Sequence, residues 1–319
     1  MRPERARGRE CGGTPVIRIQ KVEDLADQAR GRAEPVPLAC AAPDDSESLA
    51  ALRKATDERI ARPLIVGRQQ AIIAVARALD IALDGFEFQD VPDPDEVPRQ
   101  AAAAVRDGRA AILMKGHLPT KVIIRAILDH DVGFRDGGML SHVALFDAPP
   151  MGKPVVVTDA GVNIRPNLSQ KIEIIRNAAD VVRRLGVRHP KVAMLAAIEH
   201  VDVKAMPATL DAKLLERMSG AGLFDDIAVQ GPLALDDAVS PDVARAKALA
   251  GPVAGNADVL VAPEIETANV LYKALTCFAG LEGASLIWGA RAPVVVPGRA
   301  DTARMKFLSI AFAAAMIEA

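Results

Sequence analysis

Residues 293–302 read Pro-Val-Val-Val-Pro-Gly-Arg-Ala-Asp-Thr, a β-branched run that stops at Pro297-Gly298 just before a predicted helix. A helix N-terminus presents unpaired backbone N–H groups and the positive end of the helix dipole, so it attracts anions. Arg299 adds a fork of donors that suits phosphate. The stretch therefore predicts a strand, a turn and a helix with an anion site between them. The alternative is a solvated loop arginine that pairs locally with Asp301.

A second junction of the same kind lies at residues 112–120, which read Ile-Leu-Met-Lys-Gly-His-Leu-Pro-Thr. A predicted strand ends at Lys115-Gly116, Thr120 is placed to cap the next helix, and Arg125 follows inside that helix. The alternative is a capped surface helix whose arginine points to solvent. Because the two junctions support each other, the sequence indicates a phosphate-handling enzyme.

Short apolar runs alternate with segments of helical periodicity along the whole chain. Continuous apolar strands separated by helices are typical of largely parallel sheets covered on both faces, so the predicted fold class is α/β. Functional groups are then expected at the carboxyl edges of the sheets. The predicted strands are 37–41, 64–67, 110–114, 142–146, 155–158, 192–196, 259–262, 286–288 and 294–296, and the predicted helices are 47–60, 69–79, 98–107, 121–129, 168–185, 210–218 and 265–278.

Composition excludes several classes of protein. The chain has 319 residues and a formal net charge of -2, so it suits two domains and offers no broad basic surface for nucleic acid. Its three cysteines are odd in number and lack CxxC spacing, so a reducing cytoplasm is the expected location. Residues 1–13 lack an apolar signal region and are expected to be a disordered extension, and the apolar stretch 307–317 is too short for a membrane span.

Common catalytic motifs are missing from the sequence. There is no GxxxxGK[ST] and no GxGxxG after the first strand, and Arg217 stands where a nucleophile elbow at Ser219 needs glycine. The five histidines form no HxxxH or HExxH motif, so no metal site is indicated. We expect His117 to be a loop residue with a structural hydrogen bond rather than a general base, and His142 to be a satisfied, partly buried residue.

Five segments in order make the chain resemble the phosphate acetyl/butyryl transferase family, and more closely its phosphate butyryltransferase branch. The resemblance runs from about residue 22 to the C-terminus. The segments are 112–116 with Thr120 and Arg125, 140–146, 159–163, 253–260 with 269–273, and 299–302.

This resemblance implies reversible transfer of a short acyl group, butyryl or acetyl, between coenzyme A and inorganic phosphate. The implied fold is similar to that of isocitrate and isopropylmalate dehydrogenases, with an active-site cleft between two α/β domains. The first domain would be discontinuous, comprising 1–141 and 283–319, and the second would be 142–282. The resemblance also implies a homodimer or larger homo-oligomer that uses acyl-CoA as a substrate and has no tightly bound cofactor.

The same resemblance assigns roles to individual residues. Arg299 and Arg125 would hold the phosphoryl oxygens and stabilise charge on the acyl carbonyl oxygen. By its position Asp301 is the fallback acceptor of the thiol proton, and the alternative is direct capture of the thiolate by the cationic cleft. A coenzyme A thiol has a pKa of roughly 8.5, so a positive field would favour its thiolate. The expected substrate-binding residues are Gly298, Ala300, Thr302, Lys115, Gly116, Thr120, Asp159, Asn163, Asn269, Tyr272 and Lys273, although the spacing of Tyr272 fits a core residue equally well.

Two positions depart from the family pattern. The family usually has Ser immediately before the arginine, where this chain has Gly298, so a closely approaching glycine N–H is the alternative donor to the reacting carbonyl. The acetyl branch has a catalytic Asp in the following helix, where this chain has Met305 and Lys306. The alternatives are therefore an acyl-CoA- or phosphate-binding protein with weak or lost catalysis, and a decarboxylating-dehydrogenase-like enzyme, which the missing aspartate cluster for a metal disfavours.

Overall fold

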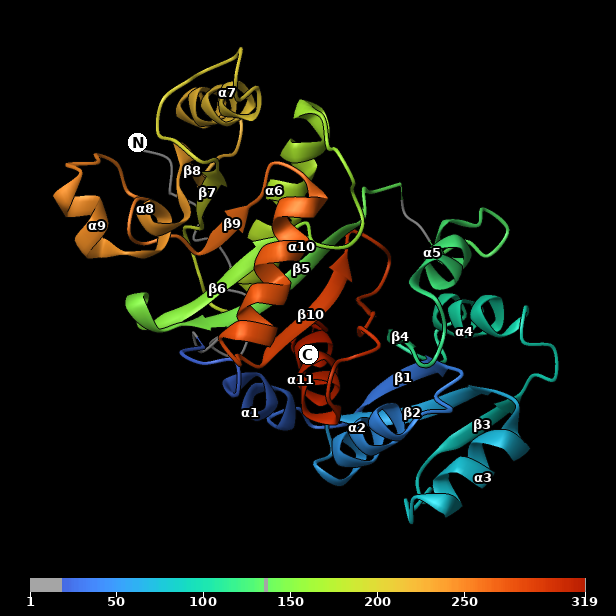
Figure 1. Ribbon diagram of the computed structural model, residues 1–319. Coiled ribbons are helices and arrows are strands. Elements are labelled where there is room, and N and C mark those ends of the chain that lie inside the picture. Colours follow the sequence, from blue (N-terminus) through green and yellow to red (C-terminus); the bar gives the residue numbers. More distant parts are fainter. Residues whose placement is uncertain (1–18, 135–136, 319) are drawn as a thin grey trace, which may run out of the picture.

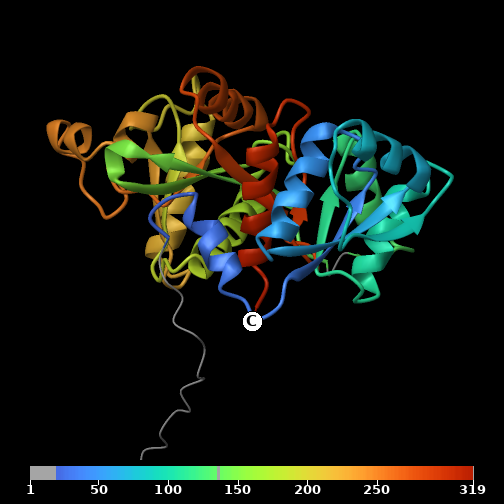
Figure 2. The ribbon, with the colours of Figure 1, turned by 90° about the horizontal axis from the view of Figure 1, so that it is seen from below.

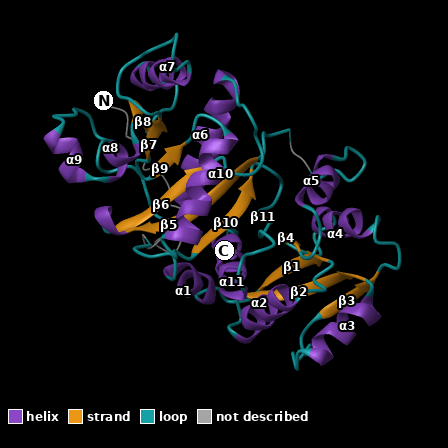
Figure 3. Ribbon diagram, in the orientation of Figure 1, coloured by secondary structure: helices purple, strands orange, loops and turns teal. Residues whose placement is uncertain are grey.

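The computed structural model describes residues 19–134 and 137–318, and these form a mixed α/β fold around one large sheet (Figure 1). The predicted extension at residues 1–13 lies outside the described residues. The sheet has eleven strands in the order β3-β2-β1-β4-β11-β10-β5-β6-β9-β7-β8. Figure 3 shows the strands as one band that crosses the molecule with helices on both sides. The sequence predicted sheets in two domains, whereas the strands join in a single sheet.

The sheet contains two parallel groups of strands joined by antiparallel pairs. In the first group, β4 pairs in parallel with β1 and β11; in the second, β6 pairs in parallel with β9. Between them, β10 is antiparallel to β11 and β5, and β5 is antiparallel to β6. The strands are β1 (Val36–Ala41), β2 (Ala61–Gly67), β3 (Glu87–Asp90), β4 (Ile112–Lys115), β5 (Ser141–Ala148), β6 (Lys153–Thr158), β7 (Lys191–Leu195), β8 (Ala228–Leu233), β9 (Val259–Val261), β10 (Gly283–Trp288) and β11 (Val294–Val295).

The three antiparallel pairings reverse the direction of the second group relative to the first. The strands β4 and β11 therefore run in the opposite direction to β6. The register nevertheless brings their carboxyl ends close together: the sheet is level at Leu113, Val294, Ile287 and His142, and Ala144 pairs with Val157 near the end of β6. The expectation that functional groups lie at the carboxyl ends of the strands stays a prediction. Groups that follow β4, β11 and β6 can therefore meet on one face of the sheet, over β10 and β5.

Periodicity missed the two strands at the edges of the sheet. β3 has no buried residue, so it lacks the apolar signal of the central strands. β8 contains Gly231 and Pro232, and proline is tolerated mainly in edge strands because it cannot donate a ladder hydrogen bond. Both strands are therefore defined by their neighbours rather than by their own sequences.

One face of the sheet is covered by helices that share a continuous apolar core. The central helix of this layer is α11, in which residues 305–314 are all buried, as expected for a helix that is apolar on all sides. Figure 2 shows α11 between the two N-terminal helices α1 and α2, and it packs on both. The helices of this face are α1 (Asp24–Arg30), α2 (Ser46–Asp57), α3 (Gln69–Ala78), α6 (Leu168–Arg184), α7 (Ala208–Gly220) and α11 (Ala303–Ala315).

The other face has two separate apolar clusters. The first lies under α4 and α5 and includes Ile123, Leu113 and Ile287. The second lies under α8 and α10 and includes Phe146, Ala268 and Tyr272. The helices of this face are α4 (Val97–Arg106), α5 (Thr120–Leu128), α8 (Leu235–Val239), α9 (Pro241–Ala246) and α10 (Ile265–Lys273), which a π-helical turn at Ala274–Phe278 extends, and a short 3-10 helix at Pro149–Met151 joins β5 to β6. Figure 1 shows α5 and α10 standing apart over the sheet.

The chain returns to its N-terminal strands at its end, because β11 pairs with β4 and α11 packs on α2. The domain boundaries at 141/142 and 282/283 stay a prediction, since the sheet runs through both segments without a break. Among the described residues, none of the helices has both the length and the apolar character needed to cross a lipid bilayer.

Candidate functional site

Polar side chains lie along the sheet face where the two apolar clusters are separate. We call Lys115, His142, Asp159, Tyr272 and Asp301 the polar strip. These residues come from both halves of the chain but influence one another electrostatically: the Asp301 carboxylate contributes to the pKa shifts of Lys115, His142 and Tyr272, and the Asp159 carboxylate contributes to that of His142. The strip is the candidate site.

The turn before α11 is closed by Asp301. Its carboxylate Oδ2 accepts a hydrogen bond from Gly298 N at 2.7 Å, and Asp301 N donates to Gly298 O at 3.2 Å. Thr302 caps α11, because its Oγ1 accepts from Met305 N at 3.2 Å. The predicted strand, turn and helix start are thus confirmed, and Asp301 is almost fully buried.

Arg299 and Ala300 form the exposed apex of this turn. Within the described part of the chain, the Arg299 guanidinium forms no hydrogen bond or ion pair. The alternative of a solvated loop arginine is right about its exposure, but its pairing with Asp301 is not formed. An exposed, unpaired arginine at a helix start is available to an anion.

Gly298 lies close against the Asp301 carboxylate. A Cβ built at this position would lie 2.8 Å from Asp301 Oδ1, so any side chain would displace the carboxylate that closes the turn. Because the Gly298 N–H is bound to that carboxylate, it is not free to donate to a reacting carbonyl. The expectation that it replaces a missing hydroxyl donor is wrong for this conformation.

The turn after β4 carries a buried lysine. Lys115 is 3% exposed, and its Nζ donates to Gly116 O at 3.1 Å. Burial and the nearby Lys306 ammonium lower the pKa of Lys115, while Cys40, Asp45 and Asp301 act in the opposite direction. No described carboxylate forms an ion pair with Lys115. A buried cation without a carboxylate partner favours the arrival of an anion.

Two details of this turn bear on the sequence predictions. Gly116 passes very close to the preceding loop, since a Cβ there would lie 2.3 Å from Ala42 O. Thr120 does not cap α5: the capping position is Pro119, which has no side chain able to bond the helix, and Thr120 is already helical. The predicted cap is wrong because the proline, rather than the threonine, occupies the extended position before the first turn.

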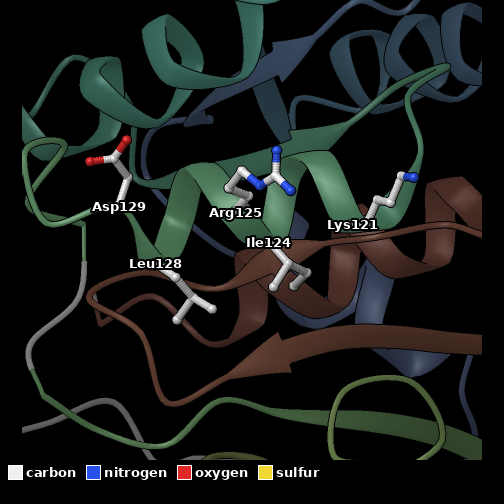
Figure 4. A pocket seen from close by; sticks show the side chains of 5 residues that line it. All are labelled: Lys121, Ile124, Arg125, Leu128 and Asp129. Atoms are coloured by element: carbon white, nitrogen blue, oxygen red, sulfur yellow. The ribbon is translucent and has the colours of Figure 1, made fainter.

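The two cationic turns follow neighbouring parallel strands. Met114 and Val295 are register partners, so Lys115 and Val296 leave the sheet side by side. Arg125 is exposed on α5 and lines a hollow of about 450 Å³ with Lys121, Ile124, Leu128 and Asp129 (Figure 4). That Arg125 and Arg299 reach a single oxyanion stays a prediction.

Asp159 holds the loop after β6 in place. Its carboxylate accepts from the backbone N–H groups of Gly161 and Val162 at 2.9 Å each, and from that of Asn163 at 3.2 Å. The Asn163 side-chain amide donates to the same carboxylate at 2.6 Å and to Leu140 O at 2.7 Å. Both residues, expected to bind substrate, are therefore occupied with the loop itself.

The residues expected on α10 divide between core and surface. Asn269 donates to Ala160 O at 3.1 Å and so ties α10 to the Asp159 loop. Tyr272 is buried against Phe146, with ring centroids 5.3 Å apart. Burial, together with the Asp301 carboxylate, raises the pKa of Tyr272, so its hydroxyl stays neutral. Lys273 is exposed, with Nζ 5.0 Å from the centre of the Tyr272 ring.

Lys306 occupies a position where the resemblance led us to look for a proton acceptor. Its buried Nζ donates to Asp45 Oδ1 at 2.7 Å and to Ser48 Oγ at 3.0 Å, which joins α11 to the start of α2. Burial acts to raise the pKa of Asp45, but the hydrogen bonds from Lys306 and Ser48 outweigh it and hold that pKa below its ordinary value. Lys306 is therefore a structural cation beside the polar strip.

The structure also shows the surroundings of three further residues that the sequence singled out: His117, Ser219 and His142. His117 Nδ1 lies 3.4 Å from Asp44 Oδ1. The Ser219 hydroxyl donates to Ile227 O at 2.9 Å and accepts from Val229 N at 3.2 Å, so it is engaged between α7 and β8. His142 is not satisfied as the sequence predicted, because its Nδ1 is buried and without a hydrogen-bond partner among the described residues. Its place beside an apolar run gave no sign of this.

Comparisons with known proteins agree along almost the whole chain. Residues 95–314 match the family described as phosphate acetyl/butaryl (butyryl) transferase. A phosphate butyryltransferase of Clostridium beijerinckii is 38% identical over 291 residues, which cover 90% of this chain and 96% of that protein. A phosphate acetyltransferase of Thermotoga maritima is 38% identical over 293 residues, covering 92% and 98%. A branched-chain phosphotransacylase structure from Enterococcus faecalis matches with a TM-score of 0.78 and 31% identity, covering 89% of this chain and 100% of that one.

Proposed function

Since the chain belongs to the phosphate acetyl/butyryl transferase family, we propose that it transfers a short acyl group reversibly between coenzyme A and inorganic phosphate. The observation that carries this proposal is 38% identity over at least 90% of the chain to relatives named for phosphate acyl transfer. The exposed Arg299 and the buried Lys115 support it, because neither forms an ion pair with a described carboxylate.

The proposed reaction needs little covalent help from the protein. A phosphate oxygen attacks the thioester carbonyl carbon, and the C=O electron pair moves to the oxygen. The carbonyl then re-forms while the C–S bond breaks, and its electron pair leaves on the thiolate. Arg299, Arg125 and Lys115 would hold the phosphate and stabilise the developing negative charge.

In this proposal Asp301 is a positioning residue. Its carboxylate is 7% exposed and receives the Gly298 N–H, so it shapes the turn that carries Arg299. The thiolate is captured directly by the cations, which lower the cost of its charge. Gly298, Ala300, Thr302 and Gly116 supply the close backbone approach, while Asp159, Asn163 and Asn269 hold the facing loop.

The wider setting belongs to the same proposal. The enzyme would work in the cytoplasm as a homodimer or larger homo-oligomer, with acyl-CoA exchanging as a substrate and no tightly bound cofactor. Its site would be a cleft between two domains of the isocitrate dehydrogenase-like arrangement, with α5 on one side and α10 on the other. Butyryl is proposed ahead of acetyl because of the branch resemblance.

Thiol release from butyryl-CoA, measured with and without phosphate, tests the function. We expect release that depends on phosphate and produces butyryl phosphate. Tight coenzyme A binding without release would instead indicate a binding protein that has lost catalysis. Metal-dependent reduction of NAD would indicate a dehydrogenase. Acetyl-CoA measured in parallel ranks the two acyl groups.

A further inference from the structure

His142 lies on β5, between the two apolar clusters of this sheet face. Ala144 and Phe146, two and four residues along the strand, belong to the cluster under α10. Ile287, the register partner of His142 on β10, belongs to the cluster under α5. Side chains alternate along a strand and register partners share a face, so the imidazole stands between the two clusters.

Contacts rather than hydrogen bonds hold the imidazole ring. The Tyr272 ring meets it nearly edge-on, with centroids 6.0 Å apart and an interplanar angle of 73°. Gly161 lies against it, since a Cβ built there would be 3.4 Å from the Cγ and Cδ2 atoms of His142. The His142 carbonyl accepts from Thr158 Oγ1 at 2.8 Å, which fixes the backbone. The ring orientation is therefore set by its surroundings.

The two ring nitrogens have different environments. Nδ1 is buried and has no hydrogen-bond partner among the described residues. Nε2 does not share this state, and the residue as a whole is partly exposed. A buried N–H without an acceptor is rarer and less tolerated than a buried lone pair. The proton of the neutral ring therefore belongs on Nε2, at the accessible side.

The charged groups around the ring come from three segments. They are Asp159 after β6, Asp301 before α11, and Lys273 on α10. Burial lowers the pKa of His142, Lys273 lowers it further, and the two carboxylates only partly oppose this. The ring is consequently neutral near pH 7 and acts as a hydrogen-bonding group rather than a cation.

From this placement we propose that His142 is a further catalytic residue, whose Nε2–H donates a hydrogen bond to the acyl carbonyl oxygen. The proposal rests on the proposed function. When the phosphate oxygen bonds to the carbonyl carbon, the C=O electron pair moves to that oxygen, which accepts the stronger hydrogen bond. When the C–S bond breaks, the carbonyl re-forms and the electron pair leaves on sulfur. His142 keeps its proton throughout, and the donor acts because it is already oriented.

Two amide variants separate a donor at Nε2 from a purely structural ring. In His142→Gln the side-chain amide nitrogen can take the position of Nε2, whereas in His142→Asn it reaches only the position of Nδ1. We expect His142→Asn to lower kcat by on the order of a hundredfold with little change in KM for butyryl-CoA, and His142→Gln to lose no more than about tenfold. His189→Asn, at a surface histidine, is the control and is expected to be silent. Equal losses in the two amide variants, or no loss in either, overturn the proposal.

A measurement on the unaltered protein does not depend on variants folding. The ¹⁵N chemical shifts of the His142 ring report which nitrogen carries the proton between pH 5 and 8. A neutral ring protonated on Nε2 supports the proposal. A ring protonated on Nδ1, or one that titrates at the ordinary value of about 6.5, overturns it.

These experiments also separate this inference from the function on which it rests. If the unaltered enzyme shows no phosphate-dependent thiol release, the proposed function fails. If the unaltered enzyme is active and the Gln and Asn variants behave alike, only the role of His142 fails.

Discussion

The loop after β6 and the turn before α11 each contain an aspartate that accepts backbone hydrogen bonds. They differ in which side chains remain available to bind a ligand. In the loop, the Asp159 carboxylate collects four hydrogen bonds, three from backbone N–H groups and one from Asn163. In the turn, Asp301 accepts one backbone bond from Gly298, while Arg299 is exposed and unpaired among the described residues.

This difference distinguishes residues that hold the backbone in place from residues that can bind a ligand. A carboxylate that satisfies its own loop has little capacity left for a substrate, and its removal leaves buried donors without acceptors. An arginine that the protein leaves unpaired costs little to retain and can bind an incoming phosphate in a fork. The resemblance implies that Asp159 and Arg299 belong to the same site. Their hydrogen bonds suggest different roles: Asp159 holds its loop, and Arg299 is available to bind phosphate.

The largest expected effect is on catalysis at Arg299. Arg299→Ala should lower kcat/KM by on the order of a hundred- to a thousandfold, because the cation that stabilises the developing charge is lost. Thermal unfolding should be unchanged, since the side chain is exposed. Arg299→Lys should fall between the two, as it keeps the charge without the fork. Arg188→Ala, at another exposed arginine, is the matched control. Activity within twofold of the unaltered enzyme would remove Arg299 from the site.

A smaller effect, on stability, is expected at Asp159. Asp159→Ala should lower the free energy of unfolding by about 3 kcal/mol, because the loop donors lose their buried acceptor. Chemical denaturation measures this, with Asp131→Ala at an exposed position as the control. Unchanged stability combined with a large rise in KM would instead make Asp159 a direct substrate ligand and erase the contrast with Arg299.

The smallest effect is expected at Lys115, where a substitution should raise rather than lower the free energy of unfolding. Lys115→Met should raise the free energy of unfolding by about 1 kcal/mol at pH 7 while reducing activity, because it removes a buried cation without a carboxylate partner. The folded-state pKa is below the unfolded one, so the unfolded chain binds more protons and the unaltered protein gains stability as pH rises.

The advantage of Lys115→Met should therefore fade as pH approaches the unfolded-state value of about 10.4. Denaturation at pH 7 and near pH 10 measures the change, with Lys204→Met at an exposed lysine as the control. A variant less stable than the unaltered protein at pH 7 would show that Lys115 serves the fold rather than an anion.

Most of the fold could be predicted from the sequence because its central elements have strong local signals. The helix at 168–185 was predicted within one residue of α6, and its capping box at Asn167 and Gln170 shows why the boundary is sharp. β3 was missed because it has no buried residue, and β8 because Gly231 and Pro232 interrupt its apolar pattern. The single sheet was also missed, since no local pattern states that β10 runs antiparallel to both of its neighbours.

The candidate site was predicted in outline and corrected in its details. Both cationic turns were found, because a strand, a glycine and a helix start leave a signature within ten residues. The predicted cap at Thr120 failed because Pro119 already occupies the extended position before the helix. The sequence does not indicate a role for His142, because the residues that pack on its ring, Gly161 and Tyr272, are distant in sequence.

By itself, the sequence determined the α/β class, the two cationic turns and the family, since periodicity, glycine placement and ordered motifs are all local properties of the chain. Only the tertiary structure decided which charges are paired. The Lys306–Asp45 pair joins residues 261 positions apart. That Arg299 and Nδ1 of His142 find no partner between residues 19 and 318, apart from 135 and 136, which are not described, follows only once every described segment has been placed. Charge pairing depends on distances between remote segments, and the packing of the sheet sets those distances.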